Sequence, residues 1–286
     1  MMQNYLVFIL RMLEFELKDR KISTSRNAFV VGIINANNDS FWKKSRGGFY
    51  LAKKLIEQGA DILDIGAESS RPGAEYISEN DELKKLIPLV KKIRKVSNIP
   101  ISIDTRKKNV IKACVEQGAD ILNDISALED DKQMVEYVSK EKIPVILMHK
   151  RKNPVIMQEY TNYENVFNEV NDYLLSRIQF AIENGIEKNK IIVDPGIGFA
   201  KDLDANLTLI KNCKKICNSE FPVMMALSRK SFLEKLTGNT VDNRLIGTIS
   251  VNLYSVINGA KFIRVHDVKE AIESLDVLKG ILNASI

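Results

Sequence analysis

The sequence predicts an α/β protein in which one (β/α)8 TIM barrel follows a short N-terminal β-hairpin extension. Eight short apolar runs alternate with longer stretches whose apolar residues recur at helical spacing. Several runs are apolar on both faces, as expected for parallel strands that are covered on both sides. From Phe29 onward these units fill a length close to the about 250 residues typical of such a barrel.

The apolar runs are the expected barrel strands, and they occur at regular intervals. They lie at residues 29–34, 62–65, 99–103, 121–125, 144–148, 191–193, 222–227 and 261–265. A doubly wound open sheet is the main alternative, but no G-x-G-x-x-G motif follows the first run. We therefore expect an extension with a hairpin over residues 1–28 and a barrel over residues 29–286.

The stretches between the runs are expected to be helices, since their charged residues fall on one face. Examples are the stretches at residues 50–58, 81–96, 107–117, 164–184 and 206–213. An internal repeat supports the alternation: Gly-Ala-Asp-Ile-Leu at residues 59–63 recurs at 118–122. A glycine that ends a helix just before a strand is typical of a βα unit. The shift of 59 residues corresponds to two such units of about 30 residues each.

The composition is that of an ordinary globular chain. It has 286 residues, of which 45% are hydrophobic and 28% charged, and a net charge of +5. These values argue against disorder, and so small a charge is poor evidence for nucleic-acid binding. The three cysteines, Cys114, Cys213 and Cys217, are interpreted as reduced, buried fillers. The first ten residues lack the pattern of a signal peptide, so we expect a cytoplasmic protein.

Polar side chains follow every predicted strand, where a (β/α)8 barrel carries its chemistry. Asp104, Asn123 and Asp194 are suited to bind a flat, nitrogen-rich ring through its N–H groups. Arg71, Lys230, Arg264 and His266 are suited to hold an anion such as a phosphate. His149, by contrast, is interpreted as structural. The complete set of strand-end groups is Asn35, Asp64 with Glu68, Asp104, Asn123, Met148 with His149, Asp194, Ser228 to Lys230, and Arg264 with His266.

Seven motifs at these positions, in order along the chain, resemble those of the dihydropteroate synthase family. The resemblance extends from Val30 to Val268. The motifs are Gly-Ile-Ile-Asn (32–35) with Asp-Ser-Phe (39–41), Asp-Ile-Gly-Ala-Glu-Ser-Ser-Arg-Pro-Gly (64–73), Ser-Ile-Asp-Thr (102–105), Asn-Asp-Ile-Ser (123–126), Asp-Pro-Gly-Ile-Gly-Phe (194–199), Ser-Arg-Lys-Ser-Phe (228–232) and Arg-Val-His-Asp-Val (264–268).

The resemblance implies that this chain joins para-aminobenzoate to 6-hydroxymethyl-7,8-dihydropterin diphosphate in folate biosynthesis, releasing diphosphate. It implies a catalytic set of Asp104, Asp194, Lys230, Arg264 and His266. The pterin would be held by Asp104, Asn123, Met148, Asp194 and Lys230, and the diphosphate by Asn35, Arg71, Arg264 and His266. The aminobenzoate would contact Phe41, Ser70, Arg71, Pro72, Phe199 and Ser231, and Asn35 would bind Mg2+.

The first loop departs from the family pattern, because Asn37-Asn38 stands where Thr-Pro is usual. This departure motivates one alternative function, a non-catalytic pterin-binding relative. A second alternative is a pterin-dependent methyltransferase of the same barrel type, which resembles this family in its pterin residues. Such a methyltransferase should lack the Ser-Arg-Lys-Ser-Phe and Arg-Val-His motifs that this chain has. The segment Leu245–Ile257 is apolar nearly all round, which predicts a partner surface and a homodimer.

Overall fold

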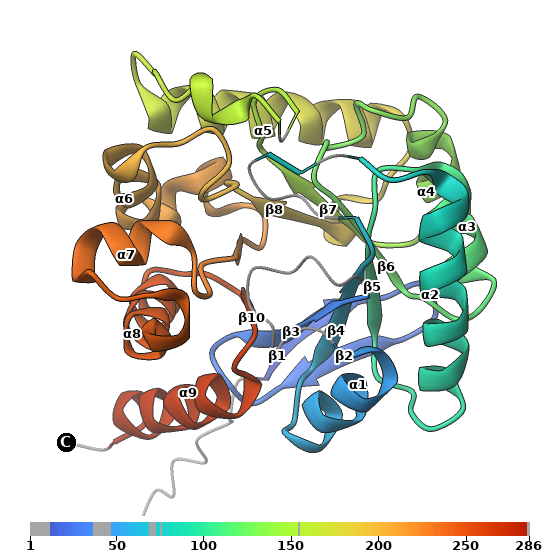
Figure 1. Cartoon of the computed structure of the whole chain (residues 1–286), viewed down its shortest axis with the longest axis horizontal. Coiled ribbons are helices and arrows are strands. Elements are labelled where there is room, and N and C mark those ends of the chain that lie inside the picture. Colours follow the sequence, from blue (N-terminus) through green and yellow to red (C-terminus); the bar gives the residue numbers. More distant parts are fainter. Residues whose placement is uncertain (1–11, 37–46, 69–72, 75, 154, 285–286) are drawn as a thin grey trace, which may run out of the picture.

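Eight parallel strands surrounded by helices form the centre of the molecule in the computed structural model (Figure 1). The structure describes residues 12–36, 47–68, 73–74, 76–153 and 155–284. The strands neighbour one another in the order β8-β7-β6-β5-β4-β3-β10-β9, and a single parallel bridge from Val193 to Val223 connects the two ends of this order. The predicted (β/α)8 barrel is confirmed. The barrel strands are β3 (Phe29–Asn35), β4 (Ile62–Gly66), β5 (Ile101–Asp104), β6 (Ile121–Asp124), β7 (Val145–Met148), β8 (Ile191–Asp194), β9 (Met224–Met225) and β10 (Phe262–Val265).

Helices cover the outside of the barrel (Figure 1), and several of them begin where a side chain caps the first turn. Ser78, Asn165 and Asp202 accept hydrogen bonds from the backbone N–H groups of Asp81, Asn168 and Ala205. The helices are α1 (Gly48–Glu57), α2 (Glu79–Arg94), α3 (Lys108–Val115), α4 (Met134–Glu141), α5 (Val166–Glu183), α6 (Leu203–Lys211), α7 (Ser231–Thr237), α8 (Leu245–Ile257) and α9 (Val268–Leu282), with short 3-10 turns at Met157–Glu159, Lys188–Lys190, Cys213–Ser219 and Val241–Asn243. The repeated segment corresponds to the passages from α1 to β4 and from α3 to β6.

Outward-facing strand residues pack against the helices in one large core, and inward-facing residues form a second core inside the barrel. The predicted hairpin, β1 (Leu13–Glu16) with β2 (Lys21–Thr24), packs on this inner core at the amino-terminal ends of the strands. There the Phe15 ring meets the Phe262 ring edge-on, with 5.3 Å between centroids, and Phe262 stacks on Phe29. The inner core thus fills the barrel at the amino-terminal ends of its strands. All three cysteines are free and buried, as predicted.

The strand register brings the predicted functional residues to one level. Asp104 pairs with Gly66 on one side and with Asn123 on the other, while Met148 pairs with Asp194. Each of these residues is at or next to the carboxyl end of its strand, so their side chains meet at one mouth of the barrel. Among the described helices, none is long and apolar enough to cross a membrane.

Candidate active site

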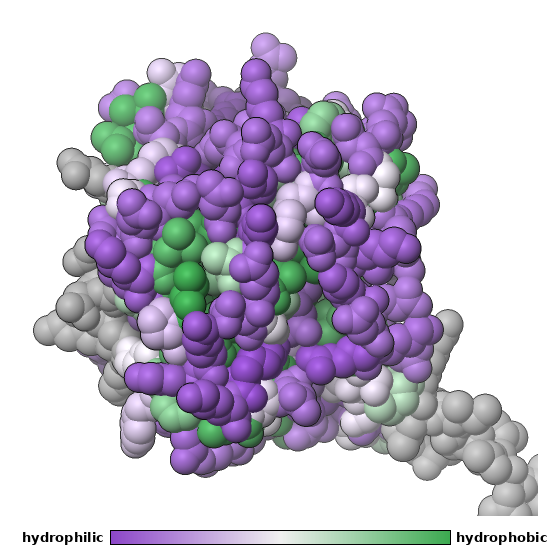
Figure 2. All heavy atoms as spheres, turned by 90° about the vertical axis from the view of Figure 1, so that its right-hand side faces the viewer, coloured by the Kyte–Doolittle hydropathy of each residue, from purple (hydrophilic) through white to green (hydrophobic). Residues whose placement is uncertain are grey.

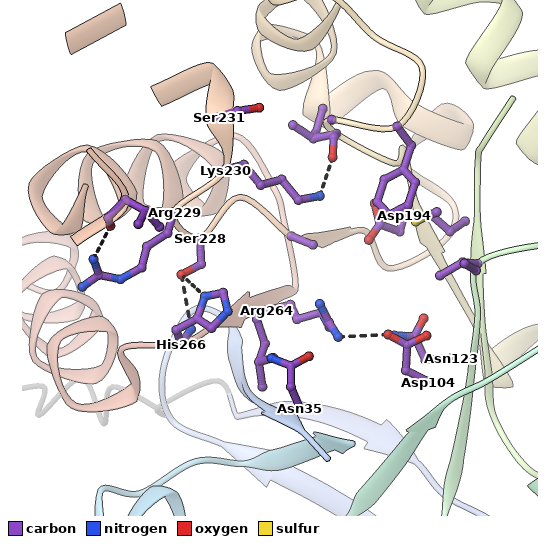
Figure 3. Close-up of a pocket in the computed structure, with 18 of the residues that line it drawn as sticks. Asn35, Asp104, Asn123, Asp194, Ser228, Arg229, Lys230, Ser231, Arg264 and His266 are labelled. Atoms are coloured by element: carbon purple, nitrogen blue, oxygen red, sulfur yellow. Dashed lines mark hydrogen bonds and ion pairs between the residues drawn. The ribbon is translucent and has the colours of Figure 1, made fainter. Parts of the chain in front are cut away.

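A pocket of about 410 Å³ opens at the carboxyl ends of the barrel strands (Figure 3). Every predicted site residue that the structure describes lines this pocket. These residues are Asn35, Asp104, Asn123, Met148, Asp194, Phe199, Lys230, Ser231, Arg264 and His266. The other predicted residues, Phe41, Ser70, Arg71 and Pro72, lie outside the described residues.

Arg264 is held between two carboxylates at the floor of the pocket. Its Nε donates a hydrogen bond to Asp64 Oδ2 at 2.6 Å, and its Nη2 donates to Asp104 Oδ2 at 3.1 Å. Asp64 also accepts hydrogen bonds from Asn123 Nδ2 at 3.2 and 3.3 Å. Asp64 is fully buried, and it connects Arg264 from β10 with Asn123 from β6. The guanidinium is therefore fixed in place before a ligand arrives.

Burial shifts the pKa of two of the carboxyl groups that line the pocket, those of Asp104 and Asp194. It raises the pKa of Asp104 from 3.8 to about 8, while Arg264 acts in the opposite direction. Burial also raises the pKa of Asp194, and the Lys230 ammonium opposes this shift. For Arg264, burial lowers the pKa, but Asp64 and Asp104 more than offset it. The guanidinium thus remains charged in the pocket.

His266 is a neutral imidazole in this setting. Burial, together with the cations Arg264, Arg229 and Lys230, lowers its pKa to about 3. Its Nδ1 lies 3.0 Å from Ser228 Oγ, and its backbone N–H donates to the same oxygen at 3.2 Å. A neutral ring contacts an anion through an N–H group and adds no positive charge.

The loop that follows β9 contributes both Arg229 and Lys230 to the lining of the pocket, and their side chains extend in opposite directions (Figure 3). Arg229 forms a bidentate ion pair with Asp267, from Nε to Oδ2 at 2.8 Å and from Nη2 to Oδ1 at 2.9 Å. Both side chains are buried, so this ion pair ties the β9 loop to the residues that follow β10. Lys230 Nζ donates to the carbonyl oxygen of Ile197 and lies 5.0 Å from the centre of the Phe199 ring.

Comparison with known proteins decides the family. Residues 31–266 match the family model described as pterin binding enzyme. The Escherichia coli (strain K12) protein named dihydropteroate synthase is 38% identical over 263 residues, which cover 89% of this chain and 92% of that protein. The chain belongs to the dihydropteroate synthase family. The resemblance inferred from the motifs is thereby confirmed, and so is the assignment as a transferase enzyme.

Two solved dihydropteroate synthase structures from Xanthomonas albilineans agree in fold. One, with 4-aminobenzoic acid, has a TM-score of 0.87 and 32% identity, and the match covers 95% of this chain and 99% of that chain. The other, in complex with 7,8-dihydropteroate, has a TM-score of 0.83 and 30% identity and covers 96% of this chain and 100% of that chain.

The family resemblance implies Mg2+, with Asn35 as its predicted protein ligand. Asn35 lines the pocket at the end of β3, and an amide oxygen is a suitable ligand for this cation. Among the described residues there is no group of three or more His, Cys, Asp or Glu side chains that could hold a metal ion. Mg2+ commonly keeps several waters and binds through few protein ligands plus substrate phosphates. The donor set that the structure describes therefore fits a cation that takes few protein ligands.

Among the described residues that are missing from the predicted set, Asp64 and Lys201 support the site from behind its lining. Asp64 lies at a predicted strand end and within a family motif, but the sequence alone indicates no role for it. Lys201 follows the motif of residues 194–199 and does not stand out in the sequence. Nothing in the sequence spacing signals that its ammonium group turns inward, where only 3% of the residue is exposed.

Proposed function

We propose that the chain condenses 6-hydroxymethyl-7,8-dihydropterin diphosphate with para-aminobenzoate, giving 7,8-dihydropteroate and diphosphate. The observation that carries this proposal is one pocket lined by two chemically different sets of side chains. Asp104, Asn123 and Asp194 provide hydrogen-bonding groups for a pterin, while Lys230 and Arg264 provide positive charge. Relatives of the chain named dihydropteroate synthase, including structures with 4-aminobenzoic acid and with 7,8-dihydropteroate, support the same reaction.

In the reaction, the bond between the exocyclic methylene carbon and the diphosphate oxygen breaks, and its electron pair leaves with the diphosphate. The reduced pterin ring stabilises the positive charge on the carbon, and a carboxylate at Asp194 favours that charge electrostatically. The neutral amine of para-aminobenzoate then forms the C–N bond and loses a proton. No protein nucleophile is required. Arg264 and Lys230 stabilise the departing anion, with neutral His266 as an N–H donor.

Mg2+ bound with the diphosphate would offset part of its negative charge, and Asn35 would hold it on the protein side. Removing divalent cations with a chelator should lower turnover, and adding Mg2+ should restore it. Asn35→Ala should require a higher Mg2+ concentration for half-maximal rate. If this variant shows the parental Mg2+ dependence, Asn35 is not the ligand.

The test of the reaction is diphosphate release that depends on para-aminobenzoate, with 7,8-dihydropteroate identified by mass spectrometry. Asp194→Asn keeps the shape of the side chain but removes the carboxylate charge. We expect kcat/KM to fall by about 10²- to 10³-fold, the range seen when one preorganised electrostatic contact is lost. Asp172→Asn, on the exposed face of α5, is the matched control and should retain the parental rate.

Two outcomes would favour the alternatives. Methyl transfer from methyltetrahydrofolate to a corrinoid protein, without diphosphate release, would identify a pterin-dependent methyltransferase. Tight pterin binding without turnover, together with failure to support growth of a folate-synthesis mutant, would identify a non-catalytic relative.

The chain is also proposed to form a homodimer through α8. The buried residues of this helix include Thr248, Asn252 and Ser255, whereas Ile246 and Ile257 are 81% and 62% exposed. An outward apolar face over polar inward positions is the reverse of an ordinary surface helix. By contrast, mainly hydrophilic side chains cover the face on the right of Figure 1, where α2 and α3 lie (Figure 2). Burying the α8 face against a second copy would remove its apolar side chains from water.

A further inference from the structure

The loop after β8 is fixed by side chains that bind its backbone one residue after another. The N–H of Gly198 donates to Asn206 Oδ1 at 2.7 Å, and the carbonyl of Gly198 accepts from Gln158 at 3.0 Å. The carbonyl of Ala200 accepts from the Tyr163 hydroxyl at 3.0 Å. Lys230 binds the carbonyl of Ile197 from the pocket side. The loop therefore has a conformation that its own short sequence does not dictate.

Two further carbonyls of this loop, at Gly196 and Phe199, both accept hydrogen bonds from Lys201. Its Nζ lies 2.9 Å from each carbonyl oxygen and 2.9 Å from His149 Nδ1. One buried amino group thus joins both ends of the turn to the residue that follows β7. We refer to Lys201, His149 and these two carbonyls as the lysine clasp.

The lysine clasp is unusual because a buried ammonium normally binds a carboxylate. Burial lowers the pKa of Lys201 well below its ordinary value, although Asp194 acts in the opposite direction. The geometry suits either protonation state. An ammonium donates to both carbonyls and to His149 Nδ1, whereas a neutral amine donates to the carbonyls and accepts from an Nδ1–H. The clasp therefore persists without a fixed charge.

His149 contributes a neutral ring that is itself held in place. Burial, together with Lys201 and Arg151, lowers the pKa of this histidine to about 2. The Tyr173 ring packs edge-on against it, with 4.9 Å between centroids. The backbone N–H of His149 donates to the carbonyl of Asp194 at 3.0 Å. His149 therefore contacts the end of β8 through its backbone and Lys201 through its ring.

Two pocket residues depend on where this loop lies. Asp194 Oδ1 accepts from the N–H of Gly196 at 2.7 Å, which sets the direction of the carboxylate. Phe199 lies at the other end of the turn, beside Lys230. Displacing the loop would therefore move both a carboxylate on the proposed pterin side and a ring on the proposed aminobenzoate side.

We propose that Lys201 is a positioning residue for the reaction: through the clasp with His149, it holds the loop of residues 194–200 in the conformation that places Asp194 and Phe199 in the pocket. It touches no substrate itself. This inference rests on the proposed function only for its effect on turnover. Its effect on the loop can be measured whether or not the chain is a synthase.

The experiment compares Lys201→Ala with Lys211→Ala, an exposed lysine on α6, as the matched control. Hydrogen–deuterium exchange of the peptide that covers residues 194–201 should be more than tenfold faster in Lys201→Ala and unchanged in Lys211→Ala. In steady-state assays, Lys201→Ala should raise the KM for both substrates and lower kcat/KM by about 10²-fold. Propylamine, which replaces the missing part of the side chain, should restore part of the rate in Lys201→Ala alone.

A second variant separates positioning from loss of folding. His149→Gln keeps a hydrogen-bond acceptor for the Lys201 amino group, so it should lose less activity than His149→Leu. The proposal is overturned if loop exchange is unchanged in Lys201→Ala, or if kcat/KM stays within twofold of the parent. It is also overturned if the folded fraction of Lys201→Ala has full activity. A parent chain without synthase activity would overturn the proposed function, while the exchange result would still decide the role of the clasp in the loop.

Discussion

Asp104 is a residue where binding and stability oppose each other. Its carboxyl group lies in the pocket beside Arg264, yet burial raises its pKa from 3.8 to about 8. Between these two values the folded chain binds a proton that the unfolded chain has released. The contribution of this group to stability is therefore greatest at low pH and is lost as the pH rises towards 8. When no ligand is present, ionising the Asp104 carboxyl group therefore costs free energy.

Asp104→Asn should change stability in a pH-dependent way, because asparagine has no proton to lose. The difference in melting temperature, variant minus parent, should be more positive at pH 8 than at pH 5, by a few degrees. Calorimetry at both pH values measures it, with exposed Asp172→Asn as the control. Turnover should fall in the same variant. A difference in melting temperature that is equal at both pH values would contradict the assigned shift.

At the scale of single residues, the sequence reveals which side chains reach the mouth of the barrel but not how they pair. Asn123 and Arg264 are predictable because they are polar residues near the carboxyl ends of apolar runs. The role of Asp64, which accepts hydrogen bonds from both of them, is not predictable. These hydrogen bonds join β4 to β6 and to β10, so they depend on the register of strands that are far apart in sequence. The role of Lys201 is not predictable either, because an exposed lysine and a buried lysine can have the same local sequence pattern.

At the scale of elements, the loop after β8 depends on a close approach of backbone atoms. Gly196 has a φ of +68°, and a Cβ atom there would lie 1.9 Å from the carbonyl oxygen of His149. No rearrangement of a flexible side chain can relieve that contact, because the opposing atom belongs to the backbone. Gly238, which follows α7, has a φ of +71°, but a Cβ atom added there would meet none of the described residues within 4 Å.

These two glycines form a matched pair for mutation. Gly238→Ala should lower stability by roughly 1 kcal/mol, the cost of a left-handed residue with a side chain, and should leave turnover near the parental value. Gly196→Ala should incur the same cost and also displace the loop, so kcat/KM should fall at least a hundredfold. Thermal unfolding and steady-state kinetics measure both effects. Equal activity in the two variants would show that the approach to His149 is unimportant.

The elements themselves were largely predictable. Each expected strand is present, because buried parallel strands need apolar residues on both faces. The run at residues 222–227 is the weakest agreement, since only Met224 and Met225 form the strand β9. The remaining residues of that run are mostly buried, but Val223 forms only an isolated bridge to Val193, and Ala226 lines the pocket instead of extending the strand. Hydrophobic pattern thus predicts burial more directly than it predicts the hydrogen bonds of a strand.

At the scale of the whole molecule, the proposed dimer makes a direct prediction. Ile246→Glu places a charge at the amino-terminal end of the exposed apolar face of α8, where burial against a second copy would be costly. Light scattering should show the mass of two chains for the parent and of one chain for the variant. Tyr50→Glu on α1, where the residue is also 81% exposed, is the control and should leave the mass unchanged. A single-chain mass for the parent would refute the dimer.

The short strand β9 leaves a seam in the barrel, because only the bridge between Val193 and Val223 joins β8 to β9 in the described ladder. Asp194 lies on one side of this seam and Lys230 on the other. A ligand held by both side chains would connect the two edges at a place where the backbone provides little hydrogen bonding between the strands. Part of the binding free energy would then appear as resistance of the barrel to opening, so the substrate would also act as a structural element of the enzyme.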